Sequence, residues 1–280
     1  MSILEKTIDD IVLQYSSRGM DKLRECHYEN YCQVAVENFL KIEKGNIFIY
    51  TGFYVDGFAE TDGPIGTYFL AKTLERLGYT PIIITDKFCL NFFKEFQTFY
   101  IGHDDCNEKT IDIFFDKFNP VCHISIERCG KNIDGSYMNA KGIDISEFTP
   151  ALDVFFKKGS ESRPSFAIGD GGNEIGMGNF KEYLSKNLDI KPSVVESHFT
   201  IIASVSNWGA YGFIAYLERY LEINLLPSFE DVNSYLEYIV SLGAVDGLTN
   251  KNEMTVDGKE WYLESEILNQ LKNVNIRNRA

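Results

Sequence analysis

Residues 165–184 read SFAIGDGGNEIGMGNFKEYL, and this stretch contains the unit from which the fold is built. Residues 165–168 predict a short buried strand, whereas residues 180–188 show the spacing of a helix. Between them, residues 167–178 hold five glycines, one Asp, one Asn and one Glu. Because glycine costs folding entropy, this density predicts a backbone shape that other residues cannot adopt. A strand joined to a helix in this way is typical of α/β proteins.

The same alternation of apolar runs and helical sequence recurs along the chain. Helical periodicity predicts helices at residues 65–77, 88–96 and 110–118, each between apolar runs. Apolar strands that alternate with helices favour a parallel sheet, because such sheets are covered on both faces. We therefore expect a doubly wound α/β fold with a mostly parallel sheet and helices on both faces. The predicted strands are residues 46–51, 81–85, 98–101, 121–126, 165–168 and 199–204.

The whole chain, residues 1–280, is predicted to form one α/β domain. Its first 40 residues are helical in character and are expected to pack on the rim of the sheet. A C-terminal helical extension is predicted at residues 229–242 and 262–271. The sequence contains no internal repeat, low-complexity run or linker rich in Pro or Ser that would separate two domains.

The acidic balance of the chain excludes two classes of partner. Its 41 acidic and 27 basic residues give a net charge of −14, which argues against binding to nucleic acids or anionic membranes. No apolar run approaches the ~20 residues that span a bilayer. The N-terminus, MSILEKTIDDIVLQY, resembles neither a signal peptide nor an Arg-rich transit peptide. The six cysteines contain no CxxC pair and are typical of reduced thiols. We expect a soluble cytoplasmic protein, and the sequence leaves a homo-oligomer open.

Polar and glycine-rich loops follow four of the predicted strands. They lie at residues 51–67, 127–146, 168–179 and 204–212. In an open parallel sheet, the carboxyl ends of the strands meet at one edge, where ligands bind. We therefore expect these four loops to form one site, although any single loop alone would be read as an ordinary glycine-rich turn.

The loop after the first strand leads directly into a helix. Pro64 stands near the first turn of that helix, where a missing N–H costs nothing. The N–H groups of Gly66 and Thr67 are candidates to bind an anion, with help from the helix dipole. Asp62 either caps the helix or holds a cation, and the sequence does not decide between these roles. The loop is not a phosphate-binding Walker loop, since no Gly-Lys-Ser/Thr follows.

The loop that contains Asp170 and Glu174 favours a hard cation. Gly169-Asp170-Gly171 begins like a dinucleotide fingerprint, but Glu174 stands where its third glycine is required. Two carboxylates four residues apart suit Mg²⁺ or Mn²⁺. We expect no NAD, and no zinc or haem, because the four histidines are dispersed and lack the spacing of ligands.

The loops after the fourth and sixth strands supply donors and cations. Arg128 and Lys141 are candidates to hold a substrate carboxylate. The alternative is that they belong to an ordinary run of charged residues exposed to solvent. Asp144 is an additional carboxylate of the fourth loop. Ser206 and Asn207 open a predicted helix and offer side-chain and backbone donors.

Taken together, these motifs resemble the D-glutamate cyclase family. The resemblance rests, in order, on ETDGPIGTYFLAKTLERLGY, IERCGKNIDGSYMNAKGIDIS, AIGDGGNEIGMGN, SNWGAYG and LGAVDGLTNKNEMTVDG. It covers nearly the whole chain, which looks like a stand-alone cyclase-like domain without the additional N-terminal domain and targeting segment of animal members. The resemblance implies an α/β lyase that interconverts D-glutamate and 5-oxo-D-proline with loss or gain of water.

The chemistry of ring closure suggests roles for the carboxylates. The α-amine must attack the γ-carboxyl carbon, whose negative charge has to be neutralised first. Asp170 and Glu174, together with Asp62 or Asp144, are expected to hold Mg²⁺ or Mn²⁺ as the Lewis acid. Glu127 or Glu174 is expected to take the amine proton, a step that typically contributes ~10²–10⁴-fold.

The same chemistry suggests roles for the donors. Arg128 or Lys141 is expected to bind the α-carboxylate of this small carboxylate substrate. Ser206, Asn207 and the backbone near Gly171 and Gly172 are expected to stabilise the tetrahedral oxyanion. Two other interpretations remain open. One is a metal-dependent hydrolase or lyase that acts on a different small amino or hydroxy acid, and the other is a non-catalytic sensor of a small ligand.

Overall fold

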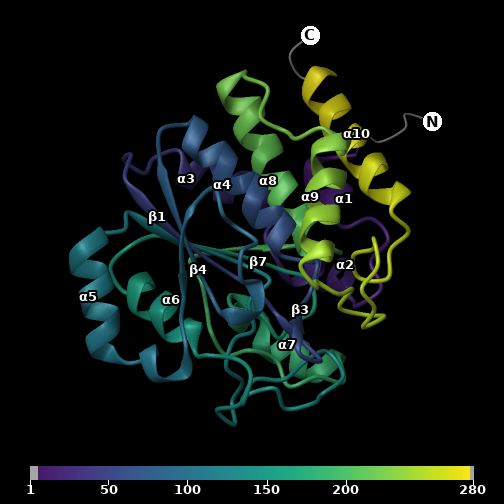
Figure 1. Cartoon of the computed structure of the whole chain (residues 1–280). Coiled ribbons are helices and arrows are strands. Elements are labelled where there is room, and N and C mark those ends of the chain that lie inside the picture. The colour runs from purple at the N-terminus through teal and green to yellow at the C-terminus, as the bar shows by residue number, and fades with distance from the viewer. Residues whose placement is uncertain (1–5, 278–280) are drawn as a thin grey trace.

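The computed structural model describes residues 6–277 and contains a six-stranded sheet in which all neighbouring strands are parallel (Figure 1). The order of the strands is β5-β4-β1-β6-β7-β8, so the predicted doubly wound α/β fold is confirmed. Five of the strands bury short runs rich in apolar residues, as is typical of parallel sheets, whereas the edge strand at residues 97–100 stays partly exposed. The strands are β1 (Asn46–Thr51), β4 (Thr80–Thr85), β5 (Gln97–Tyr100), β6 (Cys122–Ile126), β7 (Ser165–Gly169) and β8 (Phe199–Ile202).

Helices cover both faces of this sheet. Since side chains alternate along a strand, Ile47 and Ile49 join one apolar cluster, whereas Phe48 and Tyr50 join another. Figure 1 shows α5 and α6 on one side of the sheet and α3, α4 and α8 on the other. The helices are α1 (Ile8–Val12), α2 (Met20–Leu23), α3 (Tyr31–Phe39), α4 (Pro64–Arg76), α5 (Glu108–Phe118), α6 (Leu152–Ser160), α7 (Lys181–Asn187), α8 (Ser206–Leu221), α9 (Phe229–Ser241) and α10 (Tyr262–Arg277).

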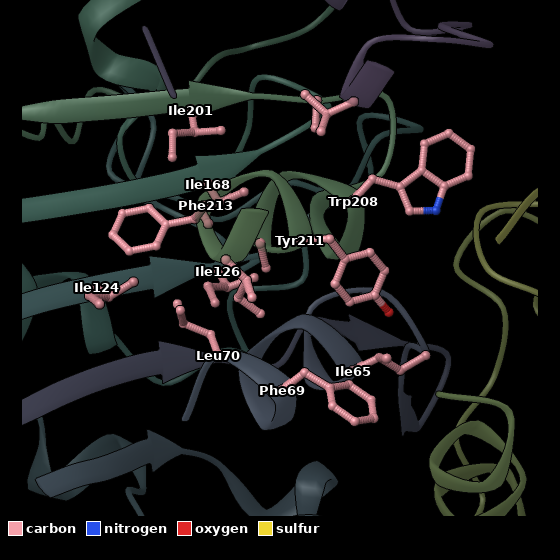
Figure 2. Packing of buried hydrophobic residues seen from close by; sticks show 14 of the residues in the cluster. Ile65, Phe69, Leu70, Ile124, Ile126, Ile168, Ile201, Trp208, Tyr211 and Phe213 are labelled. Atoms are coloured by element: carbon pink, nitrogen blue, oxygen red, sulfur yellow. The ribbon is translucent and has the colours of Figure 1, made fainter. Parts of the chain in front are cut away.

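The larger core cluster lies between the sheet and helices α4 and α8. Figure 2 shows isoleucines of β6, β7 and β8 facing α8, with side chains of α4 beside them. Trp208 and Tyr211 are almost fully buried at the start of α8. This packing fixes the N-termini of α4 and α8 at the carboxyl edge of the sheet, next to the loops that carry polar residues.

The chain reverses its direction of winding between β1 and β6. Strands β4 and β5 extend the sheet on one side of β1, and β6, β7 and β8 extend it on the other. Ligands in open α/β sheets bind outside the carboxyl ends of the strands at such a switch point. Here the loops that follow Thr51 and Ile126 begin at paired positions of neighbouring strands.

Some local predictions were wrong. Residues 88–96 do not form an α-helix, because the Asp86 side chain accepts a hydrogen bond from Phe88 N (3.0 Å) and closes a short 3₁₀ turn, Lys87–Cys89. Asn91 then takes a positive φ of 69°, which ends helical geometry. The first loop also contains an unpredicted hairpin of β2 (Tyr54–Val55) and β3 (Phe58–Ala59). No helix was predicted at the residues that form α6 (Leu152–Ser160).

The N-terminal segment packs firmly against α8. Asp9 is fully buried, and its carboxylate accepts hydrogen bonds from Cys32 N (3.0 Å) and the Tyr216 hydroxyl (2.9 Å). At the end of α1, the Val12 carbonyl accepts a hydrogen bond from Ser204 N (2.9 Å). These contacts bring the loop after α1 to the carboxyl edge of the sheet. Within residues 6–277, no helix is long and apolar enough to cross a membrane.

Candidate active site

Six buried carboxylates gather at the carboxyl edge of the sheet, and we call them the acidic cluster. Five of them form two groups that share Asp170, and within each group one carboxylate oxygen from each residue lies within 4.8 Å of the others. One group is Asp62, Asp170 and Asp257, and the other is Glu127, Asp170 and Glu174. Glu60 interacts electrostatically with several of these carboxylates and completes the cluster. The exposed fractions of the residues range from 0% to 7% (Glu60, Asp62, Glu127, Asp170, Glu174 and Asp257).

The topology explains why the carboxylates meet. Asp62 lies in the loop that follows β1, and Glu127 comes directly after β6. Asp170 and Glu174 belong to the glycine-rich loop after β7, and Asp257 precedes α10. The loops after these strands therefore converge as the sheet geometry predicts, and the segment before α10 adds a carboxylate from outside the sheet.

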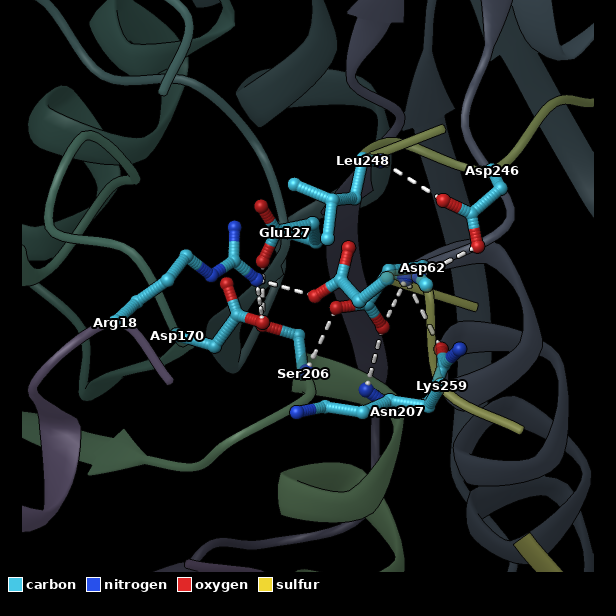
Figure 3. A network of polar contacts seen from close by, with 12 residues as sticks. Arg18, Asp62, Glu127, Asp170, Ser206, Asn207, Asp246, Leu248 and Lys259 are labelled. Carbon is cyan, nitrogen blue, oxygen red and sulfur yellow. Dashed lines mark hydrogen bonds and ion pairs between the residues drawn. The ribbon is translucent and has the colours of Figure 1, made fainter. Parts of the chain in front are cut away.

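Arg18 reaches into the acidic cluster from the loop after α1. Its Nη2 donates hydrogen bonds to both Asp170 and Asp257, and Figure 3 shows the guanidinium pointing toward Asp170, with Glu127 nearby. Gly171 leaves room for it, because a Cβ on this residue would stand 3.4 Å from Nη1 of Arg18 and 2.7 Å from Oε1 of Glu174. Sequence reasoning missed Arg18, which stands in no glycine-rich loop and follows no strand.

Burial and mutual repulsion raise the pKa values of several carboxylates in the cluster. Loss of solvation, followed by the charge of Asp257, raises the pKa of Asp62 to about 8. Loss of solvation likewise raises the pKa values of Glu127 and Asp170 well above the ordinary range, with neighbouring carboxylates adding to the effect and Arg18 opposing it. In the described part of the chain, no donor bonds to Oδ1 of Asp170 or Oε1 of Glu174. Buried carboxylate oxygens of this kind fit a hard divalent cation.

Asp62 and Asn207 cap each other's helices. The Asp62 carboxylate accepts hydrogen bonds from Ser206 N (2.8 Å) and Asn207 N (2.8 Å) at the start of α8. The Asn207 side-chain oxygen accepts from Gly63 N (2.9 Å) and Gly66 N (2.7 Å) at the start of α4. Asp62 is therefore a cap as well as a member of the acidic cluster, and the N-termini of α4 and α8 are fixed to each other.

The predicted anion site at the start of α4 does not form. The N–H of Gly66 is bonded to Asn207, and the N–H of Thr67 donates to the Gly63 carbonyl (2.9 Å). One predicted oxyanion donor of the glycine-rich loop is also occupied, since Gly172 N donates to Oε2 of Glu174 (2.7 Å). These backbone N–H groups are therefore bonded within the protein, to the side chains of Asn207 and Glu174 and to the Gly63 carbonyl.

Arg128, which was predicted to hold a substrate carboxylate, is bonded to protein partners in this structure. Its guanidinium is buried, pairs with Asp86, and donates to the carbonyls of Gly52 (2.7 Å) and Pro150 (2.7 Å). These partners tie together three loops of the edge, so the role of Arg128 is to position them.

Lys141 and Asp144 lie at the surface, outside the acidic cluster. The ammonium of Lys141 is 3.4 Å from Oδ1 of Asn250, and Asp144 accepts a hydrogen bond from Ser146 N (2.8 Å). Asp144, which was predicted as a metal ligand, is exposed and belongs to neither of the two groups of clustered carboxylates. Lys141 still lines the cavity described below.

Glu127 and Ser206 are bonded to each other inside the site. The Ser206 hydroxyl donates a hydrogen bond to Oε2 of Glu127 (2.5 Å), and both side chains are buried. Glu127 has a positive φ of 45°, a conformation that costs a residue with a side chain about 1–3 kcal/mol. Strained residues of this kind concentrate at functional sites, where the unusual backbone conformation directs the side chain into the site.

A cavity of about 400 Å³ opens onto the acidic cluster. Its polar lining includes Arg18, Glu60, Glu127 and Asp257. Apolar side chains line it as well, and among them the rings of Tyr54 and Phe148 stack with centroids 4.5 Å apart. A volume of this order is at the lower end of the ~300–1,000 Å³ typical of small-molecule sites.

The fold and this site define an α/β protein with a buried carboxylate-rich centre at a topological switch point. The chain belongs to the D-glutamate cyclase-like, C-terminal family, whose model matches residues 8–272 and so includes Arg18 and the whole acidic cluster. The human protein D-glutamate cyclase, mitochondrial, is 31% identical over 177 residues, which cover 54% of this chain. The match spans only 28% of that human protein.

Among solved structures, a short chain dehydrogenase family protein from Francisella tularensis subsp. tularensis SCHU S4 overlaps 70% of this chain and 83% of its own. The two are 13% identical with a TM-score of 0.30, and this likeness carries no argument about fold or function.

Proposed function

We propose that this chain is a lyase that interconverts D-glutamate and 5-oxo-D-proline plus water. Family membership supports the class of reaction, and the human relative carries the same activity in its name. The observation that carries the proposal is the acidic cluster, which is buried, holds unpartnered carboxylate oxygens and faces a cavity large enough for a small amino acid. A cytoplasmic location remains part of the proposal.

The acidic cluster fits Mg²⁺ or Mn²⁺ at the group of Glu127, Asp170 and Glu174, where Asp170 and Glu174 would hold the ion and Glu127 would stay free to exchange protons. The other group of three is less open, because the Arg18 guanidinium already bridges Asp170 and Asp257. A bound divalent cation would supply Lewis acidity, which polarises the γ-carboxyl group for attack. It would also neutralise carboxylates that otherwise repel an anionic substrate.

Ring closure requires two proton transfers that buried carboxylates can support. The ammonium group of D-glutamate must lose a proton before its nitrogen attacks the γ-carboxyl carbon. The new C–N bond gives a tetrahedral centre, whose nitrogen loses a second proton. One C–O bond then breaks, and that oxygen leaves as water with the two protons that the nitrogen released. Glu127 lines the cavity, and loss of solvation raises its pKa well above the ordinary value, so its carboxyl group is suited to hold and return a proton.

Ser206 and Asn207 act by positioning in this proposal. Ser206 bonds to Glu127 and so orients the proposed base. Asn207 is committed to the start of α4 and is not available to stabilise an oxyanion. Its contribution to turnover comes from holding the loop that carries Asp62.

The variants Asp170→Asn and Glu174→Gln test the proposal. We expect each to lower the turnover of both D-glutamate and 5-oxo-D-proline by about 10²-fold or more, since each removes a charge that the reaction needs. Asp116→Asn is the matched control, because Asp116 is exposed on α5 and lies outside the site. Unchanged turnover in both cluster variants would remove the acidic cluster from the mechanism. Binding of D-glutamate to the wild-type protein without turnover would instead favour a sensor.

A further inference from the structure

We propose that Arg18 binds the α-carboxylate of the substrate and so selects amino acids in which this group is free. The inference rests on the proposed function and identifies the residue that determines specificity at the same site. Arg18 is contributed by the loop after α1, a segment separate from the loops that follow the strands.

The guanidinium of Arg18 is anchored on one side and open on the other. Its Nη2 is bonded to Asp170 and Asp257, which fixes its orientation. A guanidinium carries five N–H donors in a rigid plane, so Nε and Nη1 retain three. Within residues 6–277, no acceptor is bonded to Nε or Nη1 of Arg18. The side chain is 30% exposed and lines the 400 Å³ cavity, and the three donors are therefore available to a ligand.

The charges around the cavity make Arg18 the better placed of its two basic side chains. Among the described residues that line the cavity, Arg18 and Lys141 carry the positive charges. Lys141 is exposed and contacts Asn250 at the surface, whereas Arg18 stands at the acidic cluster. An anionic substrate needs a positive group there, because the surrounding carboxylates repel it.

The position of Arg18 also suits the reaction. Glu127 and Arg18 line the same cavity, and their charges interact. An α-carboxylate held by Arg18 leaves the α-amine and the γ-carboxyl group of the substrate to face Glu127 and the acidic cluster. The pairing of guanidinium with carboxylate is planar and often bidentate, so it orients the substrate as well as attracting it.

A pair of substrates isolates this contact. D-isoglutamine keeps the α-amine and the γ-carboxyl group that react, and it replaces only the α-carboxylate with an amide. We expect the wild-type protein, supplied with Mn²⁺ or Mg²⁺, to prefer D-glutamate over D-isoglutamine by about 10- to 150-fold in kcat/KM, the range expected for a charged hydrogen-bonded contact. The ratio of the two kcat/KM values is the readout, since general damage to the site lowers both values together.

The variants Arg18→Gln and Arg18→Lys are then compared by the same ratio. We expect Arg18→Gln to bring the ratio close to one and Arg18→Lys to give an intermediate value, because lysine keeps the charge but not the planar fork. Arg24→Gln is the matched control, since Arg24 pairs with Asp10 in the same N-terminal segment and does not line the cavity. If Arg18→Gln fails to fold, the ratio of the two kcat/KM values in the wild type and in Arg18→Lys still tests the role of Arg18.

A wild-type ratio near one, or an unchanged ratio in a folded Arg18 variant, overturns the role of Arg18 and leaves the proposed function standing. If the wild-type protein turns over neither substrate, the proposed function fails. Calorimetric titration with glutarate then tests Arg18 alone, and we expect binding to the wild-type protein that weakens about 10-fold or more in Arg18→Lys. Equal binding in both proteins, or no binding to the wild type, overturns the inference.

Discussion

Replacement of Asn207 by Ala tests the reciprocal capping that holds the site together. The variant leaves the buried N–H of Gly66 without its acceptor at 2.7 Å, and it removes the donor at 3.2 Å from the Thr61 carbonyl. Gly63 N keeps a bond to the Asp62 side chain at 2.9 Å. One orphaned donor costs about 1–3 kcal/mol and one lost hydrogen bond about 1 kcal/mol, so we expect the free energy of unfolding to fall by about 2–4 kcal/mol.

The loss is measured by equilibrium unfolding in urea, followed by circular dichroism, with the slope m compared between proteins. Asn187→Ala is the matched control, because Asn187 bonds to the Tyr183 carbonyl (2.8 Å) at the exposed end of α7. We expect that control to change stability by no more than about 0.5 kcal/mol. A loss in Asn207→Ala as small as that of the control, at an unchanged m, would refute the capping role.

Three further variants address other parts of the structure. Arg128→Met leaves Asp86 as an unpaired buried charge, and urea unfolding should show a loss of about 3–5 kcal/mol, whereas KM for D-glutamate in the folded fraction stays unchanged. Glu264→Gln should flatten the dependence of stability on pH between about pH 5 and 8, because loss of solvation raises the pKa of Glu264 from 4.5 to about 7. In the wild type, the stability linked to this group is complete below pH 4.5 and is lost as the pH rises through 7, a change of about 3 kcal/mol. Gly171→Ala should lower turnover by about 10²-fold, since the new Cβ would stand 2.7 Å from Oε1 of Glu174 and displace it.

Each of these variants has an outcome that would contradict its reasoning. A raised KM in Arg128→Met would return Arg128 to the substrate site. If the stability of Glu264→Gln changes with pH as steeply as that of the wild type, groups other than Glu264 would be responsible for the pH dependence. Gly102→Ala is the control for Gly171→Ala, because its Cβ would meet an exposed Asp105 oxygen at 3.4 Å without closer contact. Equal turnover in the two alanine variants would show that Glu174 tolerates displacement.

The fold was predictable because its strands are continuous apolar runs. Residues 46–51 and 121–126 are buried on both faces as β1 and β6, and such runs have few alternatives in an α/β chain. The stretch at 88–96 was misjudged because Phe92 and Phe93 show apolar spacing, yet they pack into the core from a series of turns. Apolar spacing indicates that residues are buried. It indicates a helix only where the backbone can keep helical geometry through the whole stretch.

The site was predictable only in part. Asp62, Glu127, Asp170 and Glu174 follow strands of one parallel sheet, so their convergence follows from topology. Arg18 and Asp257 come from segments next to α1 and α10, near opposite ends of the chain, and tertiary packing alone brings them together. For Asp257 the VDG at the end of LGAVDGLTNKNEMTVDG was a usable signal, because that motif is part of the family resemblance.

The role of Arg128 could not be read from sequence, since a charge after a strand does not show which way its side chain points. In the structure it turns toward Asp86 and away from the acidic cluster. The Gly66 and Gly172 donors were misassigned for a related reason. A helix start or a glycine loop offers free N–H groups in sequence, but here Asn207 and Glu174 occupy them.

The most direct test of the proposed function uses the purified wild-type protein after removal of metal. D-glutamate and 5-oxo-D-proline are incubated separately with it, with and without Mn²⁺ or Mg²⁺, and both compounds are followed by chiral chromatography. We expect interconversion that is specific to the D-series and depends on the added cation. No interconversion under any of these conditions would contradict the assignment of the acidic cluster as a D-glutamate cyclase site.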